Sequence, residues 1–173
     1  MEFTRKKHRL DPHEYIGEKW FFVTMCCEGR TPVFLEREIA EQIIAALKDE
    51  TAKHQFIVDA FCVMPDHLHF LTFGMAPTSN LLALAKSFKQ KTAYAYQQSH
   101  HKKLWQRSFY DHVLRSGESS DRVAAYIWMN PVRKEFCKSF DDYPFSGSFT
   151  RPWKTSRIVG GWSPPWKQRQ MPA

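Results

Sequence analysis

The chain has 173 residues, of which 43% are hydrophobic and 15% aromatic, and this is enough for one domain with a packed core. Its net charge is +7, its four cysteines form no C-x-x-C pair, and it has no run of about 18 apolar residues. This composition excludes a membrane-spanning helix, a zinc knuckle and a disulfide framework. The basic N-terminus also lacks the apolar segment of a secretory signal, so we expect a soluble, cytoplasmic protein with buried thiols.

The hydrophobic pattern predicts alternating strands and helices along the chain. Residues 20–27 form a first strand, residues 37–53 a helix, and residues 56–64 and 68–74 two strands joined by a turn at Pro65-Asp66. A second helix follows at residues 79–98, capped by Ser79 or Asn80. The last elements are a strand at residues 107–114 and a helix at residues 119–130, which ends before Pro131.

The order β-α-β-β-α-β-α begins with the ferredoxin-like pattern. We therefore expect an α/β (α+β) fold: an antiparallel sheet with helices packed on it, an additional C-terminal helix and an irregular tail. Residues 1–150 are assigned to one domain and residues 151–173 to a tail rich in Trp and Pro. The tail has five basic residues and no acidic one. Such a local excess of positive charge attracts polyanions, although a basic tail can also be merely solvated.

Two histidines lie on the predicted strand within MPDHLHFLTF, residues 64–73. Because side chains alternate along a strand, His67 and His69 point to one face, and Leu68 and Phe70 to the other. The two imidazoles can therefore bind one cation at metal–nitrogen distances of about 2.1 Å. The structural alternative is a pair of hydrogen-bonded histidines on a polar sheet face.

A tyrosine and an asparagine lie four residues apart in AAYIWMNPV, residues 124–132. This spacing places Tyr126 and Asn130 on one face of a helix. Pro131 biases Asn130 away from the helical region, so we expect both side chains in the last helical turn. The structural alternative is an aromatic side chain packed on the sheet and an asparagine that ends the helix.

Together, these segments resemble the HUH single-tyrosine transposases, and more closely the REP-associated tyrosine transposases. The resemblance covers roughly residues 15–148, and its motifs are WFFVT, VMPDHLHFL, SFKQKT, LWQRSFYDHVLRS, YIWMNPVRK and YPFSGS. It implies a DNA transposase and endonuclease with His67 and His69 as metal ligands and Tyr126 as the nucleophile. Asn130 takes the place of a third ligand, where the wider group often has the longer glutamine.

The resemblance implies that single-stranded DNA is nicked and rejoined through a covalent 5′-phosphotyrosine. Mg²⁺ or Mn²⁺ suits two imidazoles and one amide, and would polarise the phosphodiester. The partner is expected to be single-stranded or hairpin DNA, namely REP palindromes, bound by a nucleoid-associated monomer. Tyr110 on the fourth strand is a competing nucleophile. A non-catalytic nucleic-acid-binding module and a metal phosphoesterase that uses water are competing functions.

Basic and aromatic side chains near these motifs are candidates for the rest of the DNA surface. The candidate phosphate contacts are Lys86, Lys89, Lys91, Arg107, Arg115 and Arg133. Trp105 and Tyr110 are candidates for stacking on unpaired bases. Each has a structural alternative, which is a solvated helix face for the lysines and the core for the aromatics. The tail is expected either to cover the active site as a lid or to contact DNA as an electrostatic arm.

Overall fold

The structure is a computed structural model that describes residues 9–152 and 161–168. It is built on a five-stranded antiparallel sheet with the strand order β4-β1-β3-β2-β5. The strands are β1 Trp20–Cys26, β2 Phe56–Met64, β3 His67–Gly74, β4 Tyr110–Val113 and β5 Ser146–Gly147. Without β5, this order is the ferredoxin-like arrangement, so the predicted fold class is confirmed.

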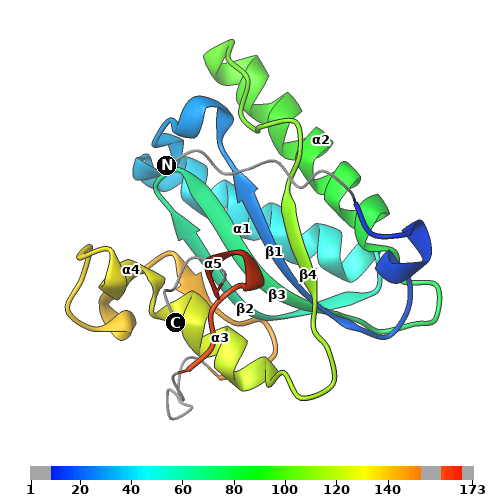
Figure 1. Cartoon of the computed structure of the whole chain (residues 1–173). Helices are drawn as coiled ribbons and strands as arrows, with labels where there is room; N and C mark the ends of the chain where they lie inside the picture. Colours follow the sequence, from blue (N-terminus) through cyan, green and yellow to red (C-terminus); the bar gives the residue numbers. More distant parts are fainter. Residues whose placement is uncertain (1–8, 153–160, 169–173) are drawn as a thin grey trace.

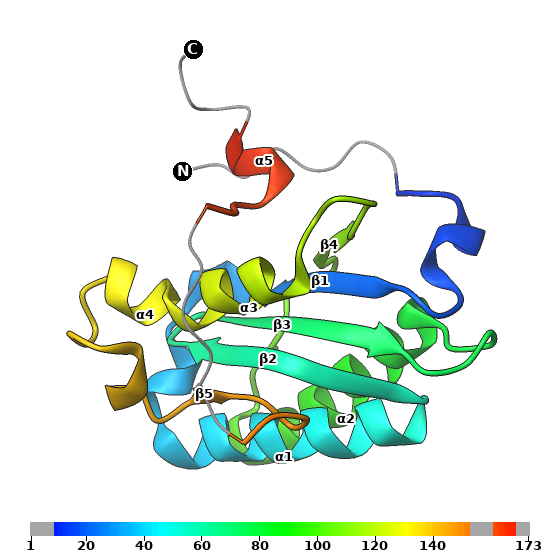
Figure 2. The ribbon, with the colours of Figure 1, turned by 90° about the horizontal axis from the view of Figure 1, so that it is seen from below.

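Helices cover both faces of this sheet. The longer ones are α1 Arg37–Lys53, α2 Leu81–His100 and α3 Ser120–Trp128, and the short ones are α4 Asn130–Arg133 and α5 Pro165–Gln168. Short 3-10 helices lie at Pro12–Tyr15, Glu28–Arg30, Val33–Leu35 and Phe140–Asp142. Figures 1 and 2 show α1 and α2 on one face, and α3 and α5 on the other. Among the described residues, no helix has the length and apolar character needed to cross a membrane.

Two separate hydrophobic clusters follow from the alternation of side chains along the strands. Phe21 and Val23 of β1 pack in the larger cluster, which α1 and α2 cover. Their neighbour Phe22 points the other way, into a smaller cluster with Ile127 and Trp128 of α3. Of the four cysteines, three are buried as expected and Cys137 is half-buried. The face under α3 therefore has the smaller apolar cluster.

The third helix differs from the prediction at its C-terminal end. It breaks at Met129, and the chain re-enters a helix at Asn130 instead of ending there. Pro131 lies in the first turn of α4, where its missing N–H is not needed for an intrahelical hydrogen bond. Tyr126 and Asn130 thus belong to successive helices, and the prediction that one helical turn holds both is wrong.

The fourth strand begins at Tyr110, later than predicted, and the segment before it is bonded to α2. Lys89 Nζ on α2 donates to the backbone oxygens of Gln106, at 2.6 Å, and Arg107, at 3.1 Å. Burial lowers the pKa of Lys89 to about 8. Lys89 thus joins α2 to the segment before β4, and its ammonium group is engaged within the protein.

Trp105 belongs to the core between the sheet and α2. Its side chain is 3% exposed, its ring packs on Phe34 and Phe88, and its Nε1 donates to Thr92 Oγ1 at 2.8 Å. A buried ring cannot stack on a DNA base without unfolding its surroundings. The prediction that Trp105 contacts bases is therefore wrong, and its structural alternative holds.

Trp105→Ala should lower the free energy of unfolding by about 3–5 kcal/mol, because it leaves a cavity in this core. Trp105→Phe should cost less, since it keeps much of the packing and loses one hydrogen bond worth about 1 kcal/mol. Urea denaturation measures both, with Tyr94→Ala on the exposed side of α2 as a control that should change stability by less than about 0.5 kcal/mol. Unchanged stability in Trp105→Ala would contradict a core role.

Candidate active site

His67 and His69 lie side by side on the α3 face of β3. Their Nε2 atoms are 2.9 Å apart, and the residues are 7% and 8% exposed. Two nitrogen lone pairs do not face each other at this distance without a proton or a cation between them. Neighbouring ligands of an octahedral ion with metal–ligand distances of about 2.1 Å are separated by about 3.0 Å. The histidine pair therefore has the spacing of two ligands of one cation.

Each histidine is oriented by a hydrogen bond at its other ring nitrogen. His67 Nδ1 donates to Asp66 Oδ1 at 2.6 Å, which leaves the lone pair on Nε2. His69 Nδ1 lies 2.7 Å from Thr24 Oγ1, a hydroxyl that can accept the Nδ1 proton and leave the same atom free. Arg30 Nε holds the second oxygen of Asp66 at 2.9 Å. Metal-binding histidines usually have such partners.

Asp66 and Thr24 were not among the predicted site residues. The sequence places Asp66 directly before His-x-His, but this position was interpreted only as a turn. Thr24 comes from β1 and meets His69 through the strand register, which pairs the two residues. The adjacent carboxylate was a signal that local sequence could have provided, whereas the hydroxyl depends on a long-range strand pair.

The surroundings keep both imidazoles neutral. Burial lowers the pKa of His67, although Asp66 acts in the opposite direction. Burial, together with the neighbouring His67 and the charges of Lys167, Arg133 and Arg30, holds the pKa of His69 well below its usual range. Burial raises the pKa of Asp66, but its hydrogen bond with His67 and the neighbouring positive charges outweigh this, so the net pKa is lowered. Neutral imidazole is the form that binds metals.

Asn130 completes the candidate donor set. It is 3% exposed, and its Nδ2 lies 3.4 Å from His67 Nε2. A 180° rotation of the amide exchanges Nδ2 for Oδ1, which would present an oxygen to a cation at this point. In the described part of the chain, no group of three or more His, Cys, Asp or Glu could hold a metal ion. His67, His69 and Asn130 are therefore the candidate donors at this point.

Tyr126 reaches the same place from α3. Its ring centroid lies 6.4 Å from that of His69 and 6.1 Å from that of Phe22. The Arg133 guanidinium lies 4.1 Å from the ring centroid, and its Nη2 donates to the backbone oxygen of Tyr126 at 2.8 Å. The predicted nucleophile, the predicted ligands and Arg133 thus come together around one point.

Tyr110, the competing nucleophile, lies on the same face of the sheet. The strand register pairs it with Thr24, which settles the face that alternation alone left open. Its ring packs on Trp166, with the centroids 6.0 Å apart, and burial raises its pKa. The Tyr126 ring lies against His69, a candidate metal ligand, and Tyr126 remains the candidate nucleophile on this contact.

Residues 161–168 cover Tyr126. The Trp162 ring lies 5.2 Å from the Tyr126 ring and 5.2 Å from Phe22, and Lys167 Nζ lies 5.5 Å from the Tyr126 ring centroid. Trp162 Nε1 donates to Glu118 Oε1 at 3.1 Å. Tyr126 is consequently only 8% exposed. This placement matches the lid alternative for the tail; residues 153–160 and 169–173 lie outside the described residues.

The predicted DNA contacts are divided between the two sides of the sheet. Lys86, Lys89 and Lys91 belong to α2, on the face opposite the histidines, and Lys91 pairs with Glu50 at 3.3 Å. Arg107 and Arg115 are exposed at the two ends of β4. Among the predicted phosphate contacts, Arg133 is the one that contacts Tyr126. The other cations whose charge acts on the histidines were not predicted; they are Arg30, Lys134 and Lys167.

Asp66→Asn should weaken divalent-cation binding about 10–100-fold, because the carboxylate that orients His67 loses its charge. Calorimetric titration with Mn²⁺ measures this directly and does not depend on catalysis. Asp49→Asn, an exposed carboxylate on α1, is the matched control and should leave the affinity unchanged. Equal Mn²⁺ affinity in Asp66→Asn and wild type would contradict the orienting role.

Comparison with known proteins identifies the family of this chain. The model of the family described as "Transposase IS200 like" matches residues 19–130. A Haemophilus influenzae protein described as a REP-associated tyrosine transposase is 28% identical over 156 residues, 82% of this chain and 86% of its own. The REP-associated tyrosine transposase of Escherichia coli is 24% identical over 132 residues, 75% and 76% of the two chains.

A solved structure, that of a REP-associated tyrosine transposase bound to a REP hairpin, shares the fold. Its TM-score is 0.69 at 23% identity, over 82% of this chain and 81% of that one. The resemblance inferred from the sequence motifs is thus confirmed. The family is generally metal-dependent, which agrees with the paired histidines. The chain belongs to the IS200-like transposase family.

Proposed function

We propose that this transposase nicks and rejoins single-stranded DNA, with Tyr126 as the nucleophile and His67, His69 and Asn130 as ligands of a divalent cation. The observation that carries the proposal is the meeting of Tyr126 from α3 with the two histidines from β3, at 6.4 Å between the Tyr126 and His69 rings. A phenol beside two neutral, oriented imidazoles has the components needed for metal-assisted attack on a phosphodiester.

The chemistry follows from what these residues can do. A bound divalent cation would polarise the phosphodiester and offset the charge that develops on its oxygens. Tyr126 Oη loses its proton and attacks the phosphorus, and a phosphotyrosine bond forms. The bond to the 3′ oxygen of the upstream strand breaks, and this oxygen takes up a proton and leaves as a 3′-hydroxyl. The phosphotyrosine keeps the bond energy, so a 3′-hydroxyl can reverse the step without ATP. Mg²⁺ or Mn²⁺ fits the donor set, and the imidazoles favour Mn²⁺ on affinity.

The substrate we propose is a hairpin formed by REP palindromes. The names of the two relatives and of the solved complex support this class of DNA. Arg30, Arg133 and Lys134 carry positive charge close to the histidines and provide phosphate contacts for the strand that enters the site. Action on such palindromes would associate the protein with the nucleoid.

A labelled single-stranded hairpin incubated with the protein and Mn²⁺ tests this function on a denaturing gel. We expect a covalent protein–DNA adduct that is lost in EDTA and absent in Tyr126→Phe, because only the attacking oxygen is removed. Tyr110→Phe is the matched control and should still form the adduct. Cleavage without an adduct would favour a phosphoesterase that uses water, and binding without cleavage a non-catalytic module. An active Tyr126→Phe would assign the nucleophile to another residue.

Residues 161–168, which cover Tyr126, must move before DNA can reach the phenol. A double variant, Trp162→Ala with Trp166→Ala, should raise the cleavage rate about ten-fold, since it removes aromatic contacts worth about 0.5–1.5 kcal/mol each. The slope of log affinity against log salt should stay unchanged. If residues 161–168 instead act as an arm on DNA, the variant should bind more weakly and cleave no faster. Tyr94→Ala, on the far face, is the aromatic control.

A further inference from the structure

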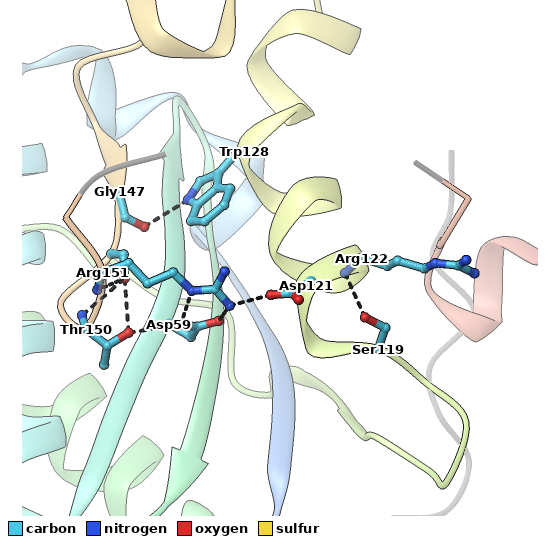
Figure 3. A network of polar contacts seen from close by, with 9 residues as sticks. Asp59, Ser119, Asp121, Arg122, Trp128, Gly147, Thr150 and Arg151 are labelled. Carbon is cyan, nitrogen blue, oxygen red and sulfur yellow. Dashed lines mark hydrogen bonds and ion pairs between the residues drawn. The ribbon is translucent and has the colours of Figure 1, made fainter. Parts of the chain in front are cut away.

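We propose that the segment from Ser146 to Arg151 is a clamp that positions Tyr126, because it fastens both ends of α3 to β2. Arg151 is the positioning residue of this clamp. The proposal rests on the nucleophilic role of Tyr126 given above. The sequence assigned Arg151 to a basic tail, but its side chain is engaged within the protein (Figure 3).

The C-terminal end of α3 is held through Trp128. Its indole is 2% exposed, and Nε1 donates to the backbone oxygen of Gly147 at 2.9 Å. Gly147 lies on β5, which pairs with β2 at Phe61 and Cys62. The last turn of the helix is therefore fixed to the sheet two residues after Tyr126.

The N-terminal end of α3 is held through Arg151. Its Nε donates to Asp59 Oδ1 at 2.7 Å, and its Nη2 donates to Asp59 Oδ2 at 2.5 Å and to Asp121 Oδ1 at 2.7 Å. Asp121 lies in the first turn of α3, next to the helix start that Ser119 caps. The planar guanidinium can bridge the two carboxylates, whereas the single ammonium of lysine lacks this geometry.

Asp59 is a rigid anchor for the clamp. It lies where the pairing of β2 with β3 shifts between Val58 and Ala60, and such a bulge turns a side chain away from the regular alternation. Its side chain is 7% exposed and also accepts a hydrogen bond from Thr150 Oγ1 at 2.9 Å. A buried carboxylate needs such partners, so Arg151 stays bound to β2. Because β2 pairs with β3, the clamp connects the strand of the metal ligands to the helix of the nucleophile.

The size of the effect follows from the geometry of the helix. With a rise of about 1.5 Å per residue, Tyr126 lies about 3 Å and Asp121 about 10 Å from Trp128 along the axis. If the first turn is freed and moves by about 2–3 Å in a pivot about Trp128, Tyr126 shifts by roughly 0.6–0.9 Å. A misplacement of about 1 Å can slow a reaction about 100-fold. We therefore expect losses of about 10–100-fold in rate without loss of DNA affinity.

The test compares Arg151→Met, Arg151→Lys and Asp121→Ala in the full chain. The single-turnover rate of adduct formation is measured at saturating hairpin and Mn²⁺, together with the dissociation constant and its salt dependence. We expect Arg151→Met and Asp121→Ala to lose about 10–100-fold in rate with unchanged affinity and salt slope, and Arg151→Lys to be intermediate. Arg122→Met is the matched control: it removes a neighbouring exposed cation that points away from the clamp, and should keep the wild-type rate (Figure 3).

Two outcomes would overturn the clamp. A normal rate in Asp121→Ala, in which only a carboxylate that is 62% exposed is lost, would do so even if Arg151→Met fails to fold. Weaker binding and a salt slope reduced by about one unit in Arg151→Met, at an unchanged rate, would make Arg151 a phosphate contact. Tyr126→Phe separates the two proposals. If it is inactive while the clamp variants keep their rate, only the clamp fails; if it is active, the proposed nucleophile fails.

Discussion

The hydrogen-bonded register of β1, β3 and β2 is the constraint on which the candidate site depends. It sets His69 opposite Thr24 on one side and opposite Cys62 on the other, and it turns His67 and His69 toward α3. A slip of one residue would turn both imidazoles into the apolar cluster under α1 and α2. The buried hydrophobic side chains on that opposite face make such a slip costly, so the core packing indirectly holds the candidate metal ligands in place.

The two faces of the sheet differ in what they hold: one face has most of the hydrophobic core, and the other has the candidate site. The α1 and α2 face has the larger cluster, with Trp105 and Phe88 in its interior. The α3 face has a smaller hydrophobic cluster and also buries polar side chains. The free-energy cost of burying them is offset by hydrogen bonds and ion pairs with particular residues. Asp66 and Thr24 form hydrogen bonds with the two histidines, and Arg151 pairs with Asp59. The same hydrogen bonds that compensate for burial on this face therefore also orient the histidines and Asp59.

Because Tyr126 is buried, residues 161–168 have to move away from it before DNA can bind. Tyr126, the proposed nucleophile, is 8% exposed and cannot reach DNA while Trp162 lies on its ring. Ring contacts and a hydrogen bond from Trp162 to Glu118 hold residues 161–168 over Tyr126. The Glu118 carboxylate also accepts a hydrogen bond from His112. The helix beneath this segment is α3, which Trp128 and Arg151 hold to β5 and β2. Such an arrangement would allow residues 161–168 to move away while Tyr126, the proposed nucleophile, keeps its position.

Local sequence determined the elements, the shared face of His67 and His69, and the family motifs, because strand alternation and helical spacing depend on neighbours in the chain. It did not determine the break at Met129, since Pro131 can either end one helix or begin the next. It assigned Trp105 and Arg151 to a DNA surface or tail, because exposure and ion pairing depend on residues distant in sequence. Asp59 and Asp121 are 92 and 30 residues from Arg151. Only the tertiary structure decides such contacts, because no local pattern records which buried carboxylate a guanidinium will meet.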